Sequence, residues 1–126
     1  MRRTKKFQRT PGSRANLKRH TKGVLNGLET KWLGVLKERM ASGEIQDILP
    51  HESMRLAIGE KCSYAPDFPV VSGDGELVFY ETKGFWTPEA RVKMKAVATR
   101  YPWFVFVGVQ WKKKQWVYEQ FSGGGE

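Results

Sequence analysis

Apolar side chains recur at every third or fourth position between Val24 and Met40, which is the spacing of an amphipathic helix. The apolar positions are Leu25, Leu28, Trp32, Val35, Leu36 and Met40. Ser42 and Gly43 follow directly, and this pair is typical of a helix end. The pattern therefore predicts a first helix over Val24–Met40 that packs one face onto the core.

The run Glu76–Lys83 contains the apolar, aromatic-rich stretch Leu77–Tyr80, which predicts a strand. Because alternate residues of a strand point to the same face, one face holds Leu77, Phe79, Glu81 and Lys83. Burial of this face would leave the Glu81 carboxylate and the Lys83 ammonium at its end unless they face each other, a metal ion or a substrate. The alternative is a strand end that turns its charged residues into solvent.

The rest of the pattern predicts short strands and one more helix. Thr87 as N-cap and Pro88 at the first helical position begin that helix. Its apolar stripe consists of Ala90, Met94, Val97 and Tyr101. Asp74 and Gly75 form a strong hairpin-turn signal. Further strands are predicted around Ile45–Leu49, Met54–Ile58, Tyr64–Val71, Trp103–Val109 and Trp116–Phe121, the last two joined by a turn through Lys112–Lys114. This order predicts an α/β fold with a central mixed β-sheet flanked by helices.

Several single residues carry structural expectations of their own. Pro66 and Pro69 suggest an edge strand or a bulge, since proline cannot donate to a strand ladder. The five tryptophans are expected mostly in the core. Cys62 is the single cysteine and is interpreted as a structural thiol, without a disulfide partner. His20 and His51 lack the paired spacing of a zinc site and are expected at the surface or in loops.

The positive charge is concentrated at the N-terminus. The chain of 126 residues has a formal net charge of +9, yet 13 Lys and Arg balance 13 Asp and Glu after residue 22. Residues 1–22 contain no acid and nine cations, namely Arg2, Arg3, Lys5, Lys6, Arg9, Arg14, Lys18, Arg19 and Lys22. We therefore predict a flexible basic arm over residues 1–23, one domain over 24–121 and a flexible tail over 122–126. Such an arm suits nucleic-acid phosphates, and the alternatives are a solubilising tail or a localisation signal.

Two acidic motifs in the second half of the chain carry the main chemical signal. The motifs are Pro66-Asp67-Phe68 and Glu81-Thr82-Lys83-Gly84. Asp67 and Glu81 supply hard oxygen donors of the kind that hold Mg²⁺ or Mn²⁺, and the Lys83 cation stands beside them. Glu29 lies on or beside the apolar stripe of the first helix, where an acid needs a partner. Alternatively, Glu29 sits at the helix start because a carboxylate is favourable against the helix dipole there.

A resemblance is carried by Gly27-Leu28-Glu29 on the first helix, by Tyr64-Ala65-Pro66-Asp67-Phe68, and by Glu81-Thr82-Lys83-Gly84 followed by an aromatic residue and a basic helix. Together these motifs resemble the PD-(D/E)XK nuclease superfamily. Within it they look most like phage endonuclease I, a family of Holliday junction resolvases, over about residues 25–106. The resemblance implies a restriction-endonuclease-like core. It also implies a site for Mg²⁺ (or Mn²⁺) formed by Asp67, Glu81 and the Thr82 carbonyl.

The resemblance further implies that Glu29 serves a second metal ion or its water shell, and that Lys83 orients or activates the attacking water. The segment Glu44–Ser63 departs from the family, in which the equivalent region helps to build a dimer. Its strand-like stretches could pair across an interface or swap between chains. The alternative is an ordinary hairpin inside one subunit.

Three functions remain open from the sequence. The first is a metal-dependent, structure-specific endonuclease that resolves four-way (Holliday) DNA junctions. The second is a nuclease that acts on flaps or nicked duplex, and the third is a non-catalytic basic protein that binds nucleic acid and has a structural ion cluster. Symmetric resolution of a junction predicts a homodimer. Beyond the arm, the predicted DNA contacts are Trp86, Arg91, Lys93 and Lys95, although a solvated helix face is the alternative for the three cations.

The hydrophobic pattern also bears on location. The longest apolar run, Trp103–Val109, is far too short to span a bilayer, so no contact with a membrane is expected. The basic N-terminus lacks the apolar stretch of a signal peptide. The sequence therefore predicts a cytoplasmic protein of a phage-infected or bacterial cell.

Overall fold

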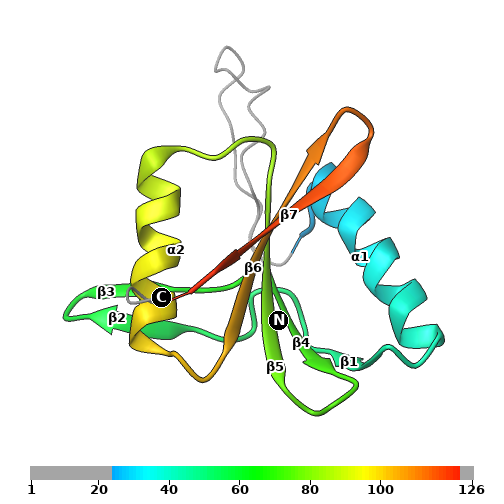
Figure 1. The fold of residues 1–126 in the computed structure, drawn as a ribbon, viewed down its shortest axis with the longest axis horizontal. Helices are drawn as coiled ribbons and strands as arrows, with labels where there is room; N and C mark the ends of the chain where they lie inside the picture. Colours follow the sequence, from blue (N-terminus) through cyan, green and yellow to red (C-terminus); the bar gives the residue numbers. More distant parts are fainter. Residues whose placement is uncertain (1–23, 123–126) are drawn as a thin grey trace.

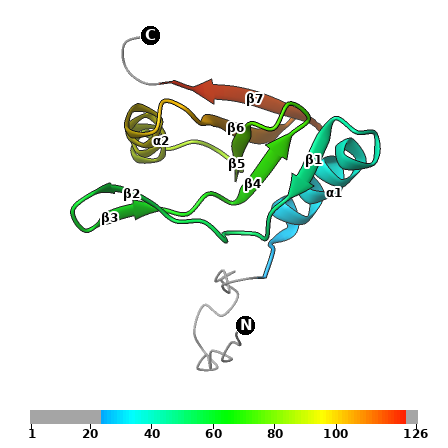
Figure 2. The ribbon, with the colours of Figure 1, turned by 90° about the horizontal axis from the view of Figure 1, so that it is seen from below.

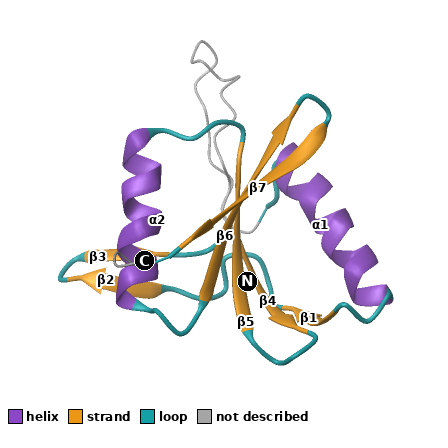
Figure 3. Cartoon of the chain, in the orientation of Figure 1, coloured by secondary structure: helices purple, strands orange, loops and turns teal. Residues whose placement is uncertain are grey.

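Two helices flank a five-stranded mixed sheet in the computed structural model, which describes residues 24–122 (Figures 1 and 3). The predicted basic arm and residues 123–126 lie outside the described residues. The elements are α1 (Gly27–Ala41), β1 (Ile45–Ile48), β2 (Leu56–Gly59), β3 (Cys62–Tyr64), β4 (Phe68–Ser72), β5 (Leu77–Lys83), α2 (Pro88–Arg100), β6 (Val105–Lys112) and β7 (Gln115–Phe121). The strand order is β1-β4-β5-β6-β7, in which β5 and β6 are parallel and the other neighbours antiparallel. The predicted α/β fold with a central mixed sheet is confirmed.

The helices cover opposite faces of the sheet (Figure 2). The core on the α1 face contains Trp32, Leu36, Ile45, Phe68, Val70 and Val109. The core on the α2 face contains Leu56, Tyr64, Phe79, Met94, Val97, Ala98, Phe106 and Phe121. The neighbours Phe79 and Tyr80 on β5 pack into different cores, as strand alternation requires. The predicted apolar stripes of both helices are therefore the faces that the fold buries, except for Met40 at the end of α1, which is 38% exposed.

α1 begins at Gly27, three residues after the predicted start, because Asn26 caps it. The Asn26 side chain accepts a hydrogen bond from the Glu29 backbone N–H, and the Glu29 side chain accepts one from the Asn26 backbone N–H. This reciprocal pair is a capping box. The helix ends at Ala41 with Ser42 as its C-cap, so the predicted end at Ser42 and Gly43 is confirmed. Gly43 has a φ of +86°, a left-handed conformation that glycine adopts without steric cost.

The predicted single strand over Tyr64–Val71 is wrong, because the chain forms two strands there, β3 and β4. Pro66 lies between them and has no N–H to donate to a ladder. β3 instead pairs with β2 in a separate hairpin, and this hairpin packs against α2, where the Tyr101 hydroxyl donates to the Ala57 carbonyl at 2.7 Å. The segment Glu44–Ser63 thus folds as β1 and part of this hairpin within one chain.

β4 is not an edge strand, contrary to one of the predictions from its prolines, because it lies between β1 and β5. Pro69 fits this position because its carbonyl accepts from the Leu49 N–H at 2.9 Å, just after β1 ends at Ile48. No donor is needed from Pro69 at that point. The register irregularity lies instead in the edge strand β1, between Ile45 and Asp47.

The tryptophans are not mostly core residues, which corrects the prediction. Trp32 is fully buried, whereas Trp103 is 73% exposed. The half-buried ones are Trp86, Trp111 and Trp116. Trp103 lies in a turn closed by the bond from the Phe104 N–H to the Tyr101 carbonyl, and β6 begins only at Val105. The turn places Trp103 outside the sheet, so the sheet cannot bury it.

Both predicted hairpin turns are present. Ser72 and Glu76 close the turn between β4 and β5, and Gly75 adopts a φ of +88° in it. Lys113 and Lys114 join β6 to β7, both with positive φ, as a two-residue hairpin turn requires. Along residues 24–122 the structure has no helix that is long and apolar enough to cross a membrane. Cys62 is exposed, so its interpretation as a structural thiol is wrong.

Candidate metal centre

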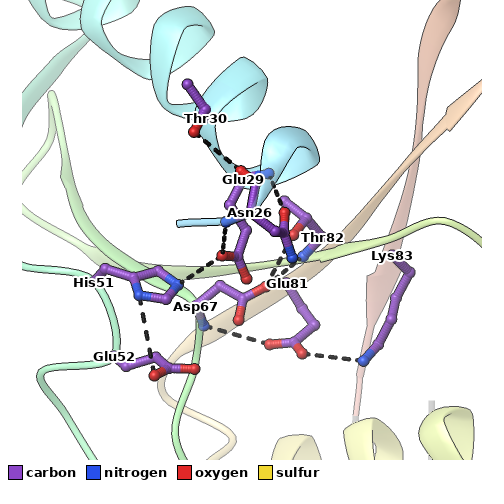
Figure 4. Close-up of polar contacts among 9 residues, drawn as sticks. All are labelled: Asn26, Glu29, Thr30, His51, Glu52, Asp67, Glu81, Thr82 and Lys83. Atoms are coloured by element: carbon purple, nitrogen blue, oxygen red, sulfur yellow. Dashed lines mark hydrogen bonds and ion pairs between the residues drawn. The ribbon is translucent and has the colours of Figure 1, made fainter. Parts of the chain in front are cut away.

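Three carboxylates meet at one end of the sheet (Figure 4). Glu29 comes from the first turn of α1, Asp67 from the residue before β4, and Glu81 from β5. They are 5%, 6% and 9% exposed, respectively. Lys83 follows on the same face of β5 and places its Nζ 3.3 Å from Glu81 Oε2. The fold therefore brings together the predicted site residues, Thr82 included.

Local contacts hold Glu29 and Asp67 in place. Glu29 Oε1 accepts the capping-box bond from the Asn26 N–H at 3.0 Å. Asp67 Oδ2 accepts from the Thr82 backbone N–H at 2.9 Å and from the Thr82 hydroxyl at 3.0 Å. These bonds form because β4 and β5 are antiparallel neighbours with Phe68 opposite Tyr80. Thr82 thus positions Asp67 through two donors, a role that the prediction of its carbonyl as a ligand did not include.

Glu81 has a partner that the sequence analysis missed. The Tyr64 hydroxyl donates to Glu81 Oε1 at 2.6 Å, and the Asp67 backbone N–H approaches the same oxygen at 3.4 Å. Tyr64 is buried at the end of β3 and belongs to the core on the α2 face. Nothing in the local pattern around Tyr64 signals this contact, because Glu81 lies far along the chain. The Lys83 ammonium takes the other carboxylate oxygen.

Burial and mutual repulsion act on the acidic groups. Burial, followed by the charge of Glu81, raises the pKa of Asp67 from 3.8 to about 8, against opposing hydrogen bonds from Thr82. Burial also raises the pKa of Glu81, and the Lys83 charge is the main opposing influence. The pKa of Tyr64 is raised by burial and then by Glu81, so its hydroxyl remains a donor. A divalent cation would offset this repulsion, and carboxylate oxygens are suitable ligands for Mg²⁺ and Mn²⁺.

His51, which is predicted at the surface or in a loop, also belongs to this cluster. It does lie in a loop, between β1 and β2, but its side chain is only 8% exposed. Its Nε2 lies 3.4 Å from Glu29 Oε1 (Figure 4). One ligand atom each from Glu29, His51 and Asp67 lie within 4.8 Å of one another. No spacing rule could have found this residue, because its partners come from α1 and the start of β4.

A pocket of about 230 Å³ opens onto Asp67 and Glu81. It is lined by Glu52, Tyr64, Ala65, Asp67, Glu81, Lys83, Ala90, Lys93 and Met94. Lys93 extends from α2, with its Nζ 6.0 Å from the centre of the Tyr64 ring. Two ammonium groups therefore lie at the pocket that the carboxylates face. This combination can admit an anionic group beside a bound cation.

The predicted DNA contacts outside the arm differ in their surroundings. The Trp86 ring packs on Gly108 and on Phe121. A Cβ added at Gly108 would lie 2.3 Å from Trp86 Cζ2, so much of this ring is used in packing. Arg91 forms an ion pair with Glu119. Lys93 lines the pocket, and Lys95 is exposed on α2. The nine cations of the arm lie outside the described residues, so the structure provides no view of them.

Asp67, Glu81 and Lys83 carry the resemblance to PD-(D/E)XK nucleases, and they meet in one place. Comparisons with family models, with curated proteins and with solved structures found no match for this chain. Membership of that superfamily therefore stays a prediction from the motifs.

Proposed function

We propose that this protein is a metal-dependent endonuclease that hydrolyses phosphodiester bonds in branched DNA. The main support is the convergence of Glu29, Asp67 and Glu81, all buried, with Lys83 at the end of the same strand as Glu81. Three buried carboxylates so close together are unfavourable when ionised, unless a cation is bound among them. A pocket with two lysines beside the carboxylates suits a phosphate group next to such a cation.

Each residue of the site has a separate role in this proposal. Asp67 and Glu81 hold the cation, and Glu29 holds a second ion or its water. A bound Mg²⁺ or Mn²⁺ would stabilise the attacking and leaving oxygens of the phosphodiester. The Lys83 side chain is 32% exposed and lines the pocket, where its ammonium would orient the attacking water through hydrogen bonds. Tyr64 and Thr82 fix the orientations of Glu81 and Asp67 through the bonds described above.

The charge distribution supports a polyanionic substrate. β5 and β6 are parallel, with Lys83 opposite Gln110, so the turn through Lys112–Lys114 lies at the same end of the sheet as the carboxylates. Lys93 adds a cation on the α2 side of the pocket. The basic arm would contribute further phosphate contacts. Preference for four-way junctions, and a dimer that cuts both strands, are parts of the proposal that rest on the motif resemblance.

The test is cleavage of a four-way junction, a flap and a linear duplex with Mg²⁺ or Mn²⁺. We expect Glu81→Gln to reduce cleavage by more than about 100-fold, since even outer-shell changes at metal sites cost about 10- to 100-fold. DNA binding should be unchanged or stronger, because a negative charge is removed. The matched control is Glu76→Gln, an exposed carboxylate just before the same strand.

Wild-type cleavage by the Glu81→Gln protein would refute this site. DNA binding without cleavage in either metal would favour the non-catalytic alternative. A preference for the junction, together with twice the 14.5 kDa chain mass in light scattering, would support symmetric resolution. A monomer that only nicks would favour flaps or nicked duplex.

A further inference from the structure

An imidazole group stands among the carboxylates of the proposed centre, on the side of Glu29. His51 Nε2 lies 3.4 Å from Glu29 Oε1, and one ligand atom each from Glu29, His51 and Asp67 lie within 4.8 Å of one another. Asp67 therefore has the His51 imidazole on one side and the Glu81–Lys83 pair on the other. The two halves of the centre differ in donor chemistry.

The fold places His51 there through backbone bonds. The Glu52 N–H donates to the Asp67 carbonyl at 3.0 Å, which ties the loop before β2 directly to the acidic motif. Glu52 adopts a φ of +56° at this bond. The imidazole packs at 5.2 Å from the Phe68 ring, between centroids, and is 8% exposed. The side chain is thus held in a fixed orientation beside Asp67.

The orientation of the ring is that of a metal ligand. Nε2 faces Glu29, while Nδ1 lies 4.0 Å from Glu52 Oε1 (Figure 4). Histidines that bind metals usually present one nitrogen to the ion and the other to a carboxylate, a carbonyl or water, which fixes the tautomer. Glu52 is the carboxylate on that side of the ring, and because 4.0 Å is longer than a hydrogen bond, a small shift would bring it into this role.

We propose that His51 is a nitrogen ligand of the centre, so that its Glu29–His51–Asp67 half takes Mn²⁺ in preference to Mg²⁺. This inference rests on the proposed function only in placing a divalent ion at these carboxylates. Mg²⁺ favours oxygen ligands and keeps several waters, whereas imidazole binds first-row transition metals. Two hard carboxylates with a single imidazole match Mn²⁺, the hardest ion of that series. His51 and Glu29 then set the metal preference, and Glu52 positions the ring.

The test uses the full chain after removal of bound metal, with Mn²⁺ and Mg²⁺ titrated separately in a calorimeter. His51→Gln should weaken Mn²⁺ binding more than about 10-fold, the lower end of the cost of disturbing an outer shell. Mg²⁺ affinity should change much less, because the Gln side chain offers an oxygen in place of the nitrogen. Misfolding would lower both affinities, so the ratio of the two is the decisive quantity. His20→Gln, at the other histidine of the chain, is the matched control.

A spectroscopic measurement adds a second test, whose first part needs only the wild-type protein. Pulsed electron paramagnetic resonance on the Mn²⁺-loaded wild-type protein should show coupling to an imidazole nitrogen, and His51→Gln should lose that coupling. If His51→Gln fails to fold, Glu52→Gln should still weaken Mn²⁺ binding about 10-fold through loss of the ring's positioning partner.

The outcomes separate this inference from the proposed nuclease. The inference would be supported by nitrogen coupling in the wild type together with a lower ratio of Mn²⁺ to Mg²⁺ affinity in His51→Gln. Absence of that coupling, or equal Mn²⁺ affinity in wild type and His51→Gln, would overturn it while leaving an oxygen-only site and the nuclease intact. Failure of the wild type to bind either ion would refute both.

Discussion

Replacement of Asp67 by Asn should stabilise the metal-free protein at alkaline pH. Asn keeps a side-chain oxygen that can accept the two bonds from Thr82, so the packing between β4 and β5 is retained. The change removes a buried negative charge beside Glu81 and Glu29. Loss of this charge removes the repulsion that the metal-free fold must tolerate.

The pKa of Asp67 sets the magnitude and the sign. It rises from 3.8 to about 8 on folding, chiefly through burial and then through Glu81. Because the folded-state pKa is the higher one, the stability contributed by protonated Asp67 is complete below pH ~4 and is lost as pH rises through about 8. At about 1.4 kcal/mol per pKa unit, the ionised carboxyl costs on the order of 5 kcal/mol above pH 8, of which about 3 kcal/mol develops between pH 5.5 and 8.5.

The assay is urea unfolding at pH 5.5 and pH 8.5 in the presence of a chelator. The free energy of unfolding of the wild type should fall between these pH values, and Asp67→Asn should remove the part of that fall that comes from Asp67, leaving the part from Glu81. The control is Asp74→Asn, an exposed carboxylate in the turn between β4 and β5, which should behave like the wild type. Mn²⁺ should stabilise the wild type more at pH 8.5 than at 5.5, because the ligands must be ionised to bind. Equal stability of wild type and Asp67→Asn at pH 8.5 would refute the reasoning.

Two further predictions concern packing and charge. Gly108→Ala would place a Cβ 2.3 Å from Trp86 Cζ2, so it should destabilise the fold by about 1–3 kcal/mol in thermal or urea unfolding. Gly34→Ala on α1, where a Cβ has open space, should instead stabilise the fold by up to about 1 kcal/mol. Equal changes in stability for Gly108→Ala and Gly34→Ala would contradict the packing of Trp86 on Gly108. A chain that starts at Val24 should stay folded, bind DNA more weakly and show a shallower dependence of affinity on salt, because fewer counterions are released. Identical salt slopes with and without the arm would exclude it from binding.

Elements governed by neighbours in the chain could be predicted from the sequence. The Thr87 cap with Pro88 after it, the Asp74-Gly75 turn and the apolar stripe of α1 all depend on residues within a few positions of one another. The strand alternation that puts Glu81 and Lys83 on one face is equally local. Sequence alone therefore determined the fold class, both helices and the main acidic motifs.

Contacts between distant segments were decided only by the tertiary structure. The capping box places Glu29 at the helix start, but only the packing of α1 against the sheet brings it to Asp67 and His51. Tyr64 reaches Glu81 because the chain leaves the β2–β3 hairpin and enters β4 beside β5. Trp103 is exposed because it lies in a turn rather than in a strand of the sheet. The periodicity of a sequence indicates which face of a helix or strand is apolar. It does not indicate which distant side chain will lie opposite that face, so these partners could not be predicted.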